Sequence, residues 1–329
     1  MNYLAHESVS QALIKRLGLV DHEELLQFLD IDMRRVGSYG SAGQPAQGPD
    51  ADGYYRDMWG VKYRDRAEGP VRHIPPFDEN TTLDQIIGHD WPDAAKLDLS
   101  WIKPECEKYH EKYSLYGSPW GPFFHQAWWI MGQENFYVWM YTRPEHIKAC
   151  IDHIVDYGIE ATRRFIEAAD GMLDFTYFGN DFGSQRGSLM SPELFNEFIR
   201  PSVKRYYDIS HEYGLNVMQH SCGGIREIIP LFIEDGVNVI DPVQTYAAGM
   251  DFDALVQDFG SQVTFHGGID TQTTLPFGTT EDVRNEVKSR LRATAGNGGY
   301  VLMSSQEYIE DVPLDNILTV YDEGSKFSA

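Results

Sequence analysis

Residues 216–224, with the sequence NVMQHSCGG, contain the pattern that decides the fold. A short apolar run ends at His220, and Cys222, Gly223 and Gly224 follow almost at once. This pattern is typical of a buried parallel strand that ends in a polar loop, where glycine lets a ligand approach the backbone closely. His220 and Cys222 are two residues apart, so on an extended strand end both side chains point to the same face.

Similar short runs recur along the chain, with helical patterns between them. They lie at 174–178, 237–240, 263–266 and 300–303, and Ser114–Tyr116 is a weaker first member. This alternation predicts α/β architecture with a parallel sheet and helical crossovers, and at this length a closed (β/α)8 TIM-type barrel. An open doubly wound sheet is the alternative, although no GxGxxG or GxxxxGK[ST] motif supports its nucleotide-binding versions.

The segment before Pro104 has a different character. It contains helical patterns at 8–17, 22–29 and 78–89, a loop rich in Gly, Pro and Asp at 37–53, and a hairpin-like stretch at 54–63. We therefore predict that residues 1–104 form an N-terminal extension that packs on the barrel as a lid. Residues 105–329 would form the barrel, and the whole chain one structural domain.

Composition limits the functional classes. With 42% hydrophobic and 23% charged residues, the 329-residue chain can bury a sizeable core. Acidic residues outnumber basic ones by 50 to 27, and the net charge of −23 disfavours nucleic acids and anionic membranes as partners. No segment has eighteen uncharged apolar residues, so we expect a cytoplasmic protein. Three cysteines are too few for a disulfide framework, and Cys150 falls on the apolar face of a helical pattern.

Polar side chains follow several of the predicted strands. Asp181 comes after the run at 174–178, His266 ends the run at 263–266, and Gln306 and Glu307 follow the last run. Carboxyl ends of strands converge at one face of a barrel, so we expect His220, Cys222, Asp181 and either Gln306 or Glu307 to line one cavity.

The spacing leaves two interpretations open for each of these groups. His220 and Cys222 form half of a zinc site, or a buried histidine beside an inert cysteine. Asp181 is a general base, or a carboxylate that holds a loop through backbone N–H groups. His266 is a substrate ligand or a structural histidine, and Asp270 caps the loop that follows it.

An aromatic cluster between Trp120 and Trp129 is denser than an ordinary helix needs, and it either binds a ring or fills the core. Arg186, after Asp181, is suited to meet a substrate carboxylate or to pair with that aspartate. The residues that we predict to bind substrate are Phe124, Trp128, Trp129, Tyr177, Arg186, Gln244 and His266.

Several motifs occur in a fixed order in the second half of the chain. They are GNDFGSQRG (179–187), SPE (191–193), HSCG (220–223), DPVQ (241–244), AGMD (248–251), GGIDTQ (267–272), LPFGT (275–279) and PLDNI (313–317). As a set they resemble the uroporphyrinogen decarboxylase superfamily, and specifically its branch of corrinoid-dependent methyltransferases. The resemblance implies a (β/α)8 barrel and a zinc ion bound by His220 and Cys222.

Two positions depart from the pattern. The arginine-rich RQAGR-type segment of true porphyrinogen decarboxylases is replaced by RRVGSYG at 34–40, so decarboxylation in the haem pathway is not expected. In the zinc methyltransferases a cysteine on the last strand is the third ligand, and that position is Gln306 here. Glu307, or Gln244 and Asp241, would then complete the metal shell.

The resemblance implies a methyltransferase that moves a methyl group from a small methylated donor to the cobalt of a separate corrinoid protein. Cobalamin would be carried by that partner, zinc would act as Lewis acid, and Asp181 and His220 would be catalytic. An aromatic-lined pocket suits a methoxyarene as the donor. A metal-free decarboxylase-like lyase and a non-catalytic binding barrel are the alternatives.

Overall fold

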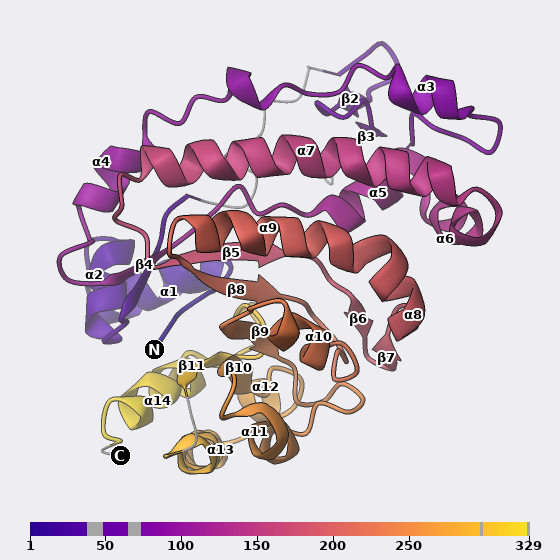
Figure 1. Ribbon diagram of the computed structural model, residues 1–329. Helices are drawn as coiled ribbons and strands as arrows, with labels where there is room; N and C mark the ends of the chain where they lie inside the picture. Colours follow the sequence, from indigo (N-terminus) through magenta and orange to yellow (C-terminus); the bar gives the residue numbers. More distant parts are fainter. Residues whose placement is uncertain (38–48, 65–73, 297–298, 328–329) are drawn as a thin grey trace.

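The computed structural model describes residues 1–37, 49–64, 74–296 and 299–327 (Figure 1). In this part of the chain the main sheet has seven strands, all parallel, in the order β1-β4-β5-β8-β9-β10-β11. The sheet curls, and the long helices α7 and α9 lie along its outer side (Figure 1). Its strands are β1 Met33–Arg35, β4 Ser114–Tyr116, β5 Phe175–Gly179, β8 Asn216–His220, β9 Val239–Val243, β10 Thr264–Ile269 and β11 Tyr300–Ser304.

The register of the central strands positions the functional groups. β8 pairs with β5 and β9, so that His220 lies beside Gly179 on one side and beside Asp241 on the other. These residues end or nearly end their strands, so the loops that follow leave the sheet at the same edge. The five stronger strands predicted from the sequence are confirmed to within two or three residues at each end.

The first strand of the sheet was missed by the sequence analysis. β1 pairs with β4, and its central residue Arg34 is only 3% exposed. The Arg34 guanidinium is satisfied by two hydrogen bonds to Glu23, at 2.8 and 2.9 Å, and by the carbonyl oxygens of Ile31 and Met33. Strands were predicted from short apolar runs, and a strand with two arginines does not form such a run. The prediction that the sheet begins only near Ser114 is therefore wrong, and part of the expected lid belongs to the sheet.

The N-terminal residues lie between the two edge strands of the sheet. The N–H of Asn2 donates to the carbonyl of Leu302 in β11, and the N–H of Asp32, just before β1, donates to the carbonyl of Met1. Ala5 also forms a parallel bridge with Tyr308. The N-terminus therefore links both sides of the curl, while a closed eight-stranded barrel stays a prediction.

Residues at the first position or the N-cap mark the start of several helices. Pro144 opens α7, Ser191 caps α8 by accepting the N–H of Leu194, and Thr279 forms a capping box with Asp282 at the start of α13. The helices are α1 Glu7–Leu17, α2 His22–Phe28, α3 Leu83–Ile87, α4 Ile102–Glu107, α5 Phe123–Met131, α6 Gln133–Thr142, α7 Pro144–Ala168, α8 Pro192–Leu194, α9 Arg200–Glu212, α10 Ile229–Glu234, α11 Phe252–Phe259, α12 Thr274–Phe277, α13 Thr280–Thr294 and α14 Leu314–Gly324.

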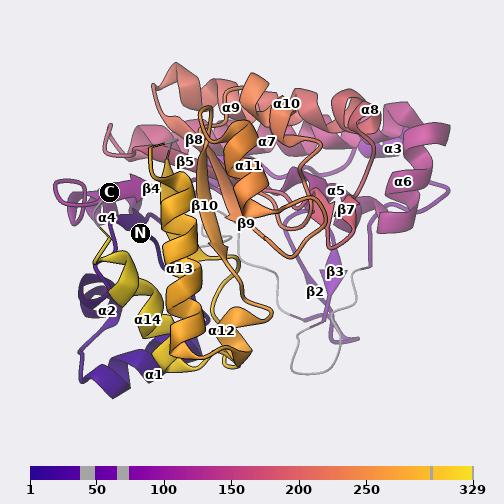
Figure 2. The same cartoon turned by 90° about the horizontal axis from the view of Figure 1, so that it is seen from below.

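Two small hairpins complete the fold. β2 Tyr55–Arg56 pairs antiparallel with β3 Lys62–Tyr63, which confirms the predicted hairpin, and β6 Gly183–Ser184 pairs with β7 Gly187–Ser188. Most of the predicted loop at 37–53 lies outside the described residues. At the other end of the molecule α1 and α14 share one hydrophobic cluster with β11, and Figure 2 shows the two helices side by side.

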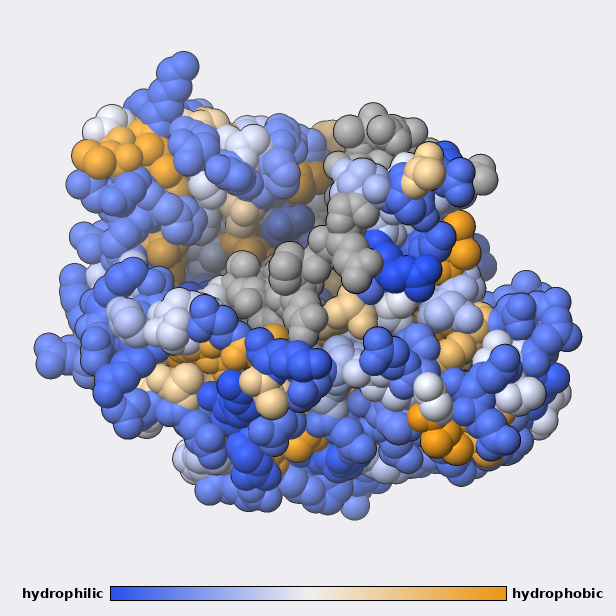
Figure 3. Space-filling model, turned by 90° about the horizontal axis from the view of Figure 1, so that it is seen from above, coloured by the Kyte–Doolittle hydropathy of each residue, from blue (hydrophilic) through white to orange (hydrophobic). Residues whose placement is uncertain are grey.

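The face seen in Figure 3 is mostly hydrophilic, with hydrophobic residues in small separate patches around a central hollow. In the described part of the chain, none of the helices has the length and apolar character needed to cross a membrane.

Candidate active site

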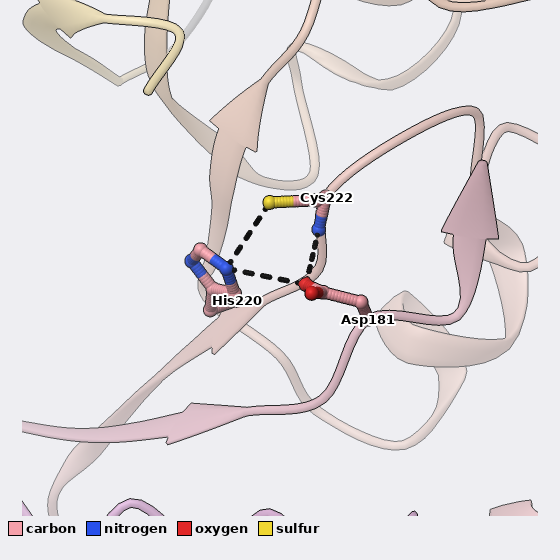
Figure 4. Close-up of side chains that lie close together, drawn as sticks. All are labelled: Asp181, His220 and Cys222. Carbon is pink, nitrogen blue, oxygen red and sulfur yellow. Dashed lines mark hydrogen bonds and ion pairs between the residues drawn. The ribbon is translucent and has the colours of Figure 1, made fainter. Parts of the chain in front are cut away.

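Three potential metal ligands meet where β5 and β8 end. Asp181 follows β5, His220 is the last residue of β8, and Cys222 lies two residues later (Figure 4). The His220 Nε2 atom is 3.3 Å from Asp181 Oδ1 and 3.4 Å from Cys222 Sγ. One ligand atom from each of the three residues lies within 4.8 Å of the other two.

These distances and charges fit a zinc ion. Tetrahedral zinc with ligand bonds of about 2.0–2.3 Å places neighbouring ligand atoms about 3.3–3.8 Å apart. A carboxylate and a thiolate together balance the charge of a dication, and the neutral imidazole adds the third ligand. Three protein ligands also leave a fourth position for a substrate atom, as in catalytic rather than structural zinc sites.

A buried network holds the imidazole of His220 in place. Its Nδ1 atom lies 2.7 Å from Asp241 Oδ2, and the Tyr177 hydroxyl donates to the same oxygen at 2.6 Å. On the other side of the carboxylate, His266 Nδ1 lies 2.5 Å from Asp241 Oδ1, and the Asn2 amide lies 3.0 Å from His266 Nε2. A carboxylate on the far nitrogen of a histidine fixes its tautomer, which leaves Nε2 of His220 available for a metal.

Burial is the largest single effect on each pKa in this cluster, but the contacts between the groups together outweigh it. Burial alone would raise the pKa of the Asp241 carboxyl, but His266 and His220 hold it well below its usual range. His220 and the N–H of Cys222 likewise outweigh burial and lower the pKa of Asp181. Burial opposes the charged form of His220, yet Cys222, Asp181 and Asp241 raise the pKa of this imidazole. The carboxyl groups of Asp181 and Asp241 are therefore ionised beside His220, and their negative charge favours a cation at this position.

Asp181 is the candidate third ligand, in place of a residue from the last strand. Its Oδ1 atom also accepts the N–H of Cys222 at 2.9 Å, so the loop-holding interpretation is confirmed as well. Gln306 reaches the cluster with its nitrogen, because Nε2 lies 3.2 Å from Cys222 Sγ while Oε1 accepts the N–H of Glu307. Gln306 is thus a hydrogen-bond donor to the sulfur, and the structure does not bring Glu307 into the three-residue set. Only the pairing of β5 with β8 reveals the position of Asp181.

A cavity of about 590 Å³ opens beside this cluster. Asp181 and His220 line it on one side, and aromatic side chains form much of the remaining wall, among them Trp59, Trp120, Trp129 and Tyr157. Trp59 and the neighbouring Asp57 come from the segment that joins the two strands of the hairpin at 55–63. Neither residue was predicted at the site, because nothing in their spacing links them to a strand end more than a hundred residues away.

Of the predicted substrate-binding residues on α5, one lines the cavity and two do not. Trp129 lines the cavity, whereas Phe124 and Trp128 lie on another face of α5, where Phe124 packs against Phe136 and Phe182. The 3.6-residue period of the helix turns positions 125, 126 and 129 toward the cavity and positions 124 and 128 away from it. For Phe124 and Trp128 the core interpretation is therefore the better one.

The other predicted substrate ligands lie away from the cavity wall in the described structure. Tyr177 and His266 belong to the Asp241 network, and Gln244 accepts the N–H of Gly223 at 2.8 Å. Arg186 is exposed in the hairpin of β6 and β7. Asp270 accepts the N–H groups of Gln272 and Thr273, which confirms its predicted capping role.

Fold and site together define a curled parallel α/β protein with a candidate Asp–His–Cys metal centre at the carboxyl ends of its strands. The chain belongs to the uroporphyrinogen decarboxylase family, whose sequence profile matches residues 59–327. The family predicted from the motifs is thereby confirmed. A search of curated protein sequences finds no significant match.

Among solved structures, a methyltransferase from Methanosarcina mazei is similar with a TM-score of 0.64 and 15% sequence identity, over 92% of this chain and 83% of that one. At this identity the likeness concerns the fold. A D-tagatose 3-epimerase-like protein (14% identity, 68% of this chain and 82% of that one) and a 3-keto-D-glucoside 4-epimerase from E. coli (12%, 77% and 95%) have TM-scores of 0.37 and 0.38. These two values are too low to carry an argument.

Proposed function

We propose that this protein is a methyltransferase that takes a methyl group from a methoxyarene and passes it to the cobalt of a separate corrinoid protein. The observation that carries the proposal is the convergence of Asp181, His220 and Cys222 beside a cavity with aromatic walls. Membership of the uroporphyrinogen decarboxylase family and the fold shared with a methyltransferase support it.

A methyl ether is a poor methyl donor because an alkoxide or phenoxide is a poor leaving group. A zinc ion held by Asp181, His220 and Cys222 would polarise the ether oxygen and so lower this barrier. The side chains of Trp59, Trp120 and Trp129 hold the ring and exclude water from it. Asp241 accepts a hydrogen bond from the Nδ1–H group of His220 and keeps the imidazole oriented. In the reaction the methyl–oxygen bond breaks, the oxygen keeps the bonding pair and takes up a proton, and Co(I) of the partner supplies the pair for the new bond.

The test combines metal analysis with a transfer assay. One thiolate binds zinc less tightly than two, so we expect sub-stoichiometric zinc after ordinary purification and about one zinc per chain after zinc is added. The zinc-loaded protein should convert free cob(I)alamin to its methylated form in the presence of methoxybenzenes, followed by absorbance. Cys222→Ala should lose most of the metal and the transfer.

Two outcomes would contradict the proposal. A zinc-replete protein that holds no divalent metal, yet still demethylates a methoxyarene, would overturn the role of zinc. A protein that neither binds metal nor transfers a methyl group would favour a metal-free lyase or a non-catalytic binding barrel. The lyase has less support because Arg186, its expected carboxylate ligand, is exposed and lies away from the cavity wall.

A further inference from the structure

One polar side chain in the cavity wall has an unmet hydrogen bond. Gln126 lies on the face of α5 that lines the cavity, between His125 and Trp129. Its side chain is buried, with 5% of the residue exposed, and its Nε2 atom has no hydrogen-bond partner among the described residues. Buried amides nearly always have a partner, so this group requires an explanation.

A ligand bound in the cavity would explain the unpaired amide of Gln126. A leucine of similar size would pack into an apolar wall without leaving an amide unpaired, so a glutamine at this position is costly in the empty cavity. A bound molecule with an acceptor oxygen near Gln126 would satisfy the amide. The cavity would then select ligands that carry this oxygen, because a ligand without it leaves the amide unpaired.

The remainder of the cavity limits the kind of ligand. Its described lining includes the carboxylates of Asp57 and Asp181 and no lysine or arginine. Asp57 is held in place by the N–H groups of Trp59 and Val61, both 2.9 Å from its Oδ1 atom. Two carboxylates within aromatic walls disfavour an anionic ring such as a benzoate, and favour an uncharged one.

We propose that Gln126 determines substrate specificity by donating a hydrogen bond to a second oxygen substituent of the methyl donor, apart from the ether oxygen that leaves. This inference rests on the proposed function and narrows its substrate class to uncharged methoxyarenes that carry another oxygen on the ring. Gln126, Asp181 and His220 line the same cavity, so one small aromatic molecule can contact both Gln126 and the candidate metal site.

Binding of matched probes to the zinc-loaded protein tests this inference. The probes are the three positional isomers of dimethoxybenzene, each compared with the ethyl-methoxybenzene in which a CH₂ replaces the second oxygen. Affinity is measured by quenching of tryptophan fluorescence, since Trp59, Trp120 and Trp129 line the cavity. For at least one isomer the wild-type protein should prefer the dimethoxy compound by about tenfold, the effect of one hydrogen bond to an otherwise unpaired group.

Gln126→Leu should abolish this preference, mainly by weakening the binding of the dimethoxy compound. Gln126→Met, which keeps the length of the side chain, should do the same and serves if the leucine variant does not fold. Gln133→Leu makes the same chemical change at an exposed position of α6 and should leave the preference intact.

The inference is overturned if no isomer pair differs in the wild type, or if the preference survives in both Gln126 variants. It is also overturned if the variants weaken the binding of the dimethoxy and the ethyl-methoxy compound equally. Gln126 would then contact the leaving oxygen or only fill space. Binding is measured without methyl transfer. A preference that depends on Gln126, seen without transfer to cob(I)alamin, would therefore support the specificity role and contradict the proposed reaction.

Discussion

Asp181 is the residue whose role changed most between sequence and structure. By position in the sequence it was a general base or a loop-holding carboxylate, and in the fold its Oδ1 atom lies 3.3 Å from Nε2 of His220. Its carboxylate would supply the negative charge of a second thiolate, while Gln306 turns its amide nitrogen toward the sulfur of Cys222. The site thus has three candidate ligands.

Asp181→Asn tests this role. Asparagine keeps the oxygen that accepts the N–H of Cys222, so the loop should stay in place while the charge is lost. Because changes outside the ligand shell already cost about 10–100-fold in metal affinity, we expect loss of a charged ligand to weaken zinc binding by more than about 100-fold. Competition with a chelator measures this change. The exposed Asp253→Asn in α11 is the matched control, and equal zinc affinity in both variants would exclude Asp181 as a ligand.

At the scale of secondary structure elements, three adjacent strands build the support for the candidate metal ligands. His220 ends β8, Asp241 lies in β9 and His266 lies in β10, and their register brings the two imidazoles to the two oxygens of one carboxylate. The N-terminal residue Asn2 contacts His266 from the other side. The elements thus fix the orientation of the site before any ligand binds.

Asp241→Asn should disturb that orientation without removing a metal ligand. An asparagine has one side-chain oxygen where the carboxylate has two, so the contacts of this residue with His220 and with His266 cannot both be kept. We expect zinc affinity to fall by about 10–100-fold and the visible spectrum of the cobalt-substituted protein to change, since the ligand geometry changes. Asp311→Asn, in an exposed loop, should alter neither property. An unchanged cobalt spectrum in Asp241→Asn would mean that the network does not orient His220.

At the scale of the whole molecule, a partly buried ion pair joins an N-terminal helix to the edge of the sheet. α2 is anchored to β1 by the ion pair of Glu23 with the buried Arg34, at 2.8 Å. Burial would raise the pKa of Glu23, but its hydrogen bonds to Arg34 and Gln27 lower it below the usual range. A lowered pKa in the folded state means that this carboxylate stabilises the fold at neutral pH.

Glu23→Gln should therefore destabilise the protein in a pH-dependent way. The native carboxylate contributes fully above the unfolded pKa of about 4.3, and its contribution is lost as pH falls through the lower folded value. We expect Glu23→Gln to reduce the free energy of unfolding by about 2 kcal/mol at pH 7, with a smaller difference from wild type below about pH 4. Urea unfolding at several pH values measures this. A difference that is constant across pH would show that lost packing, and not charge, is responsible.

The parallel α/β class, the family and the pair His220 and Cys222 could all be predicted from the sequence alone. These properties are local, since each strand is a short apolar run and the two ligands lie on one strand end. The sequence did not reveal β1, because the buried charge of Arg34 is stabilised by Glu23, eleven residues earlier.

Only the tertiary structure decided which residues complete the site. Asp181 becomes a candidate ligand through the pairing of β5 with β8, and Trp59 reaches the cavity from a hairpin that lies far away in the sequence. The same holds for Gln126, because helix rotation decides that it faces the cavity while Phe124 and Trp128 face other side chains. Contacts between distant segments depend on strand register and helix orientation, and both are set by packing of the whole chain rather than by any local pattern.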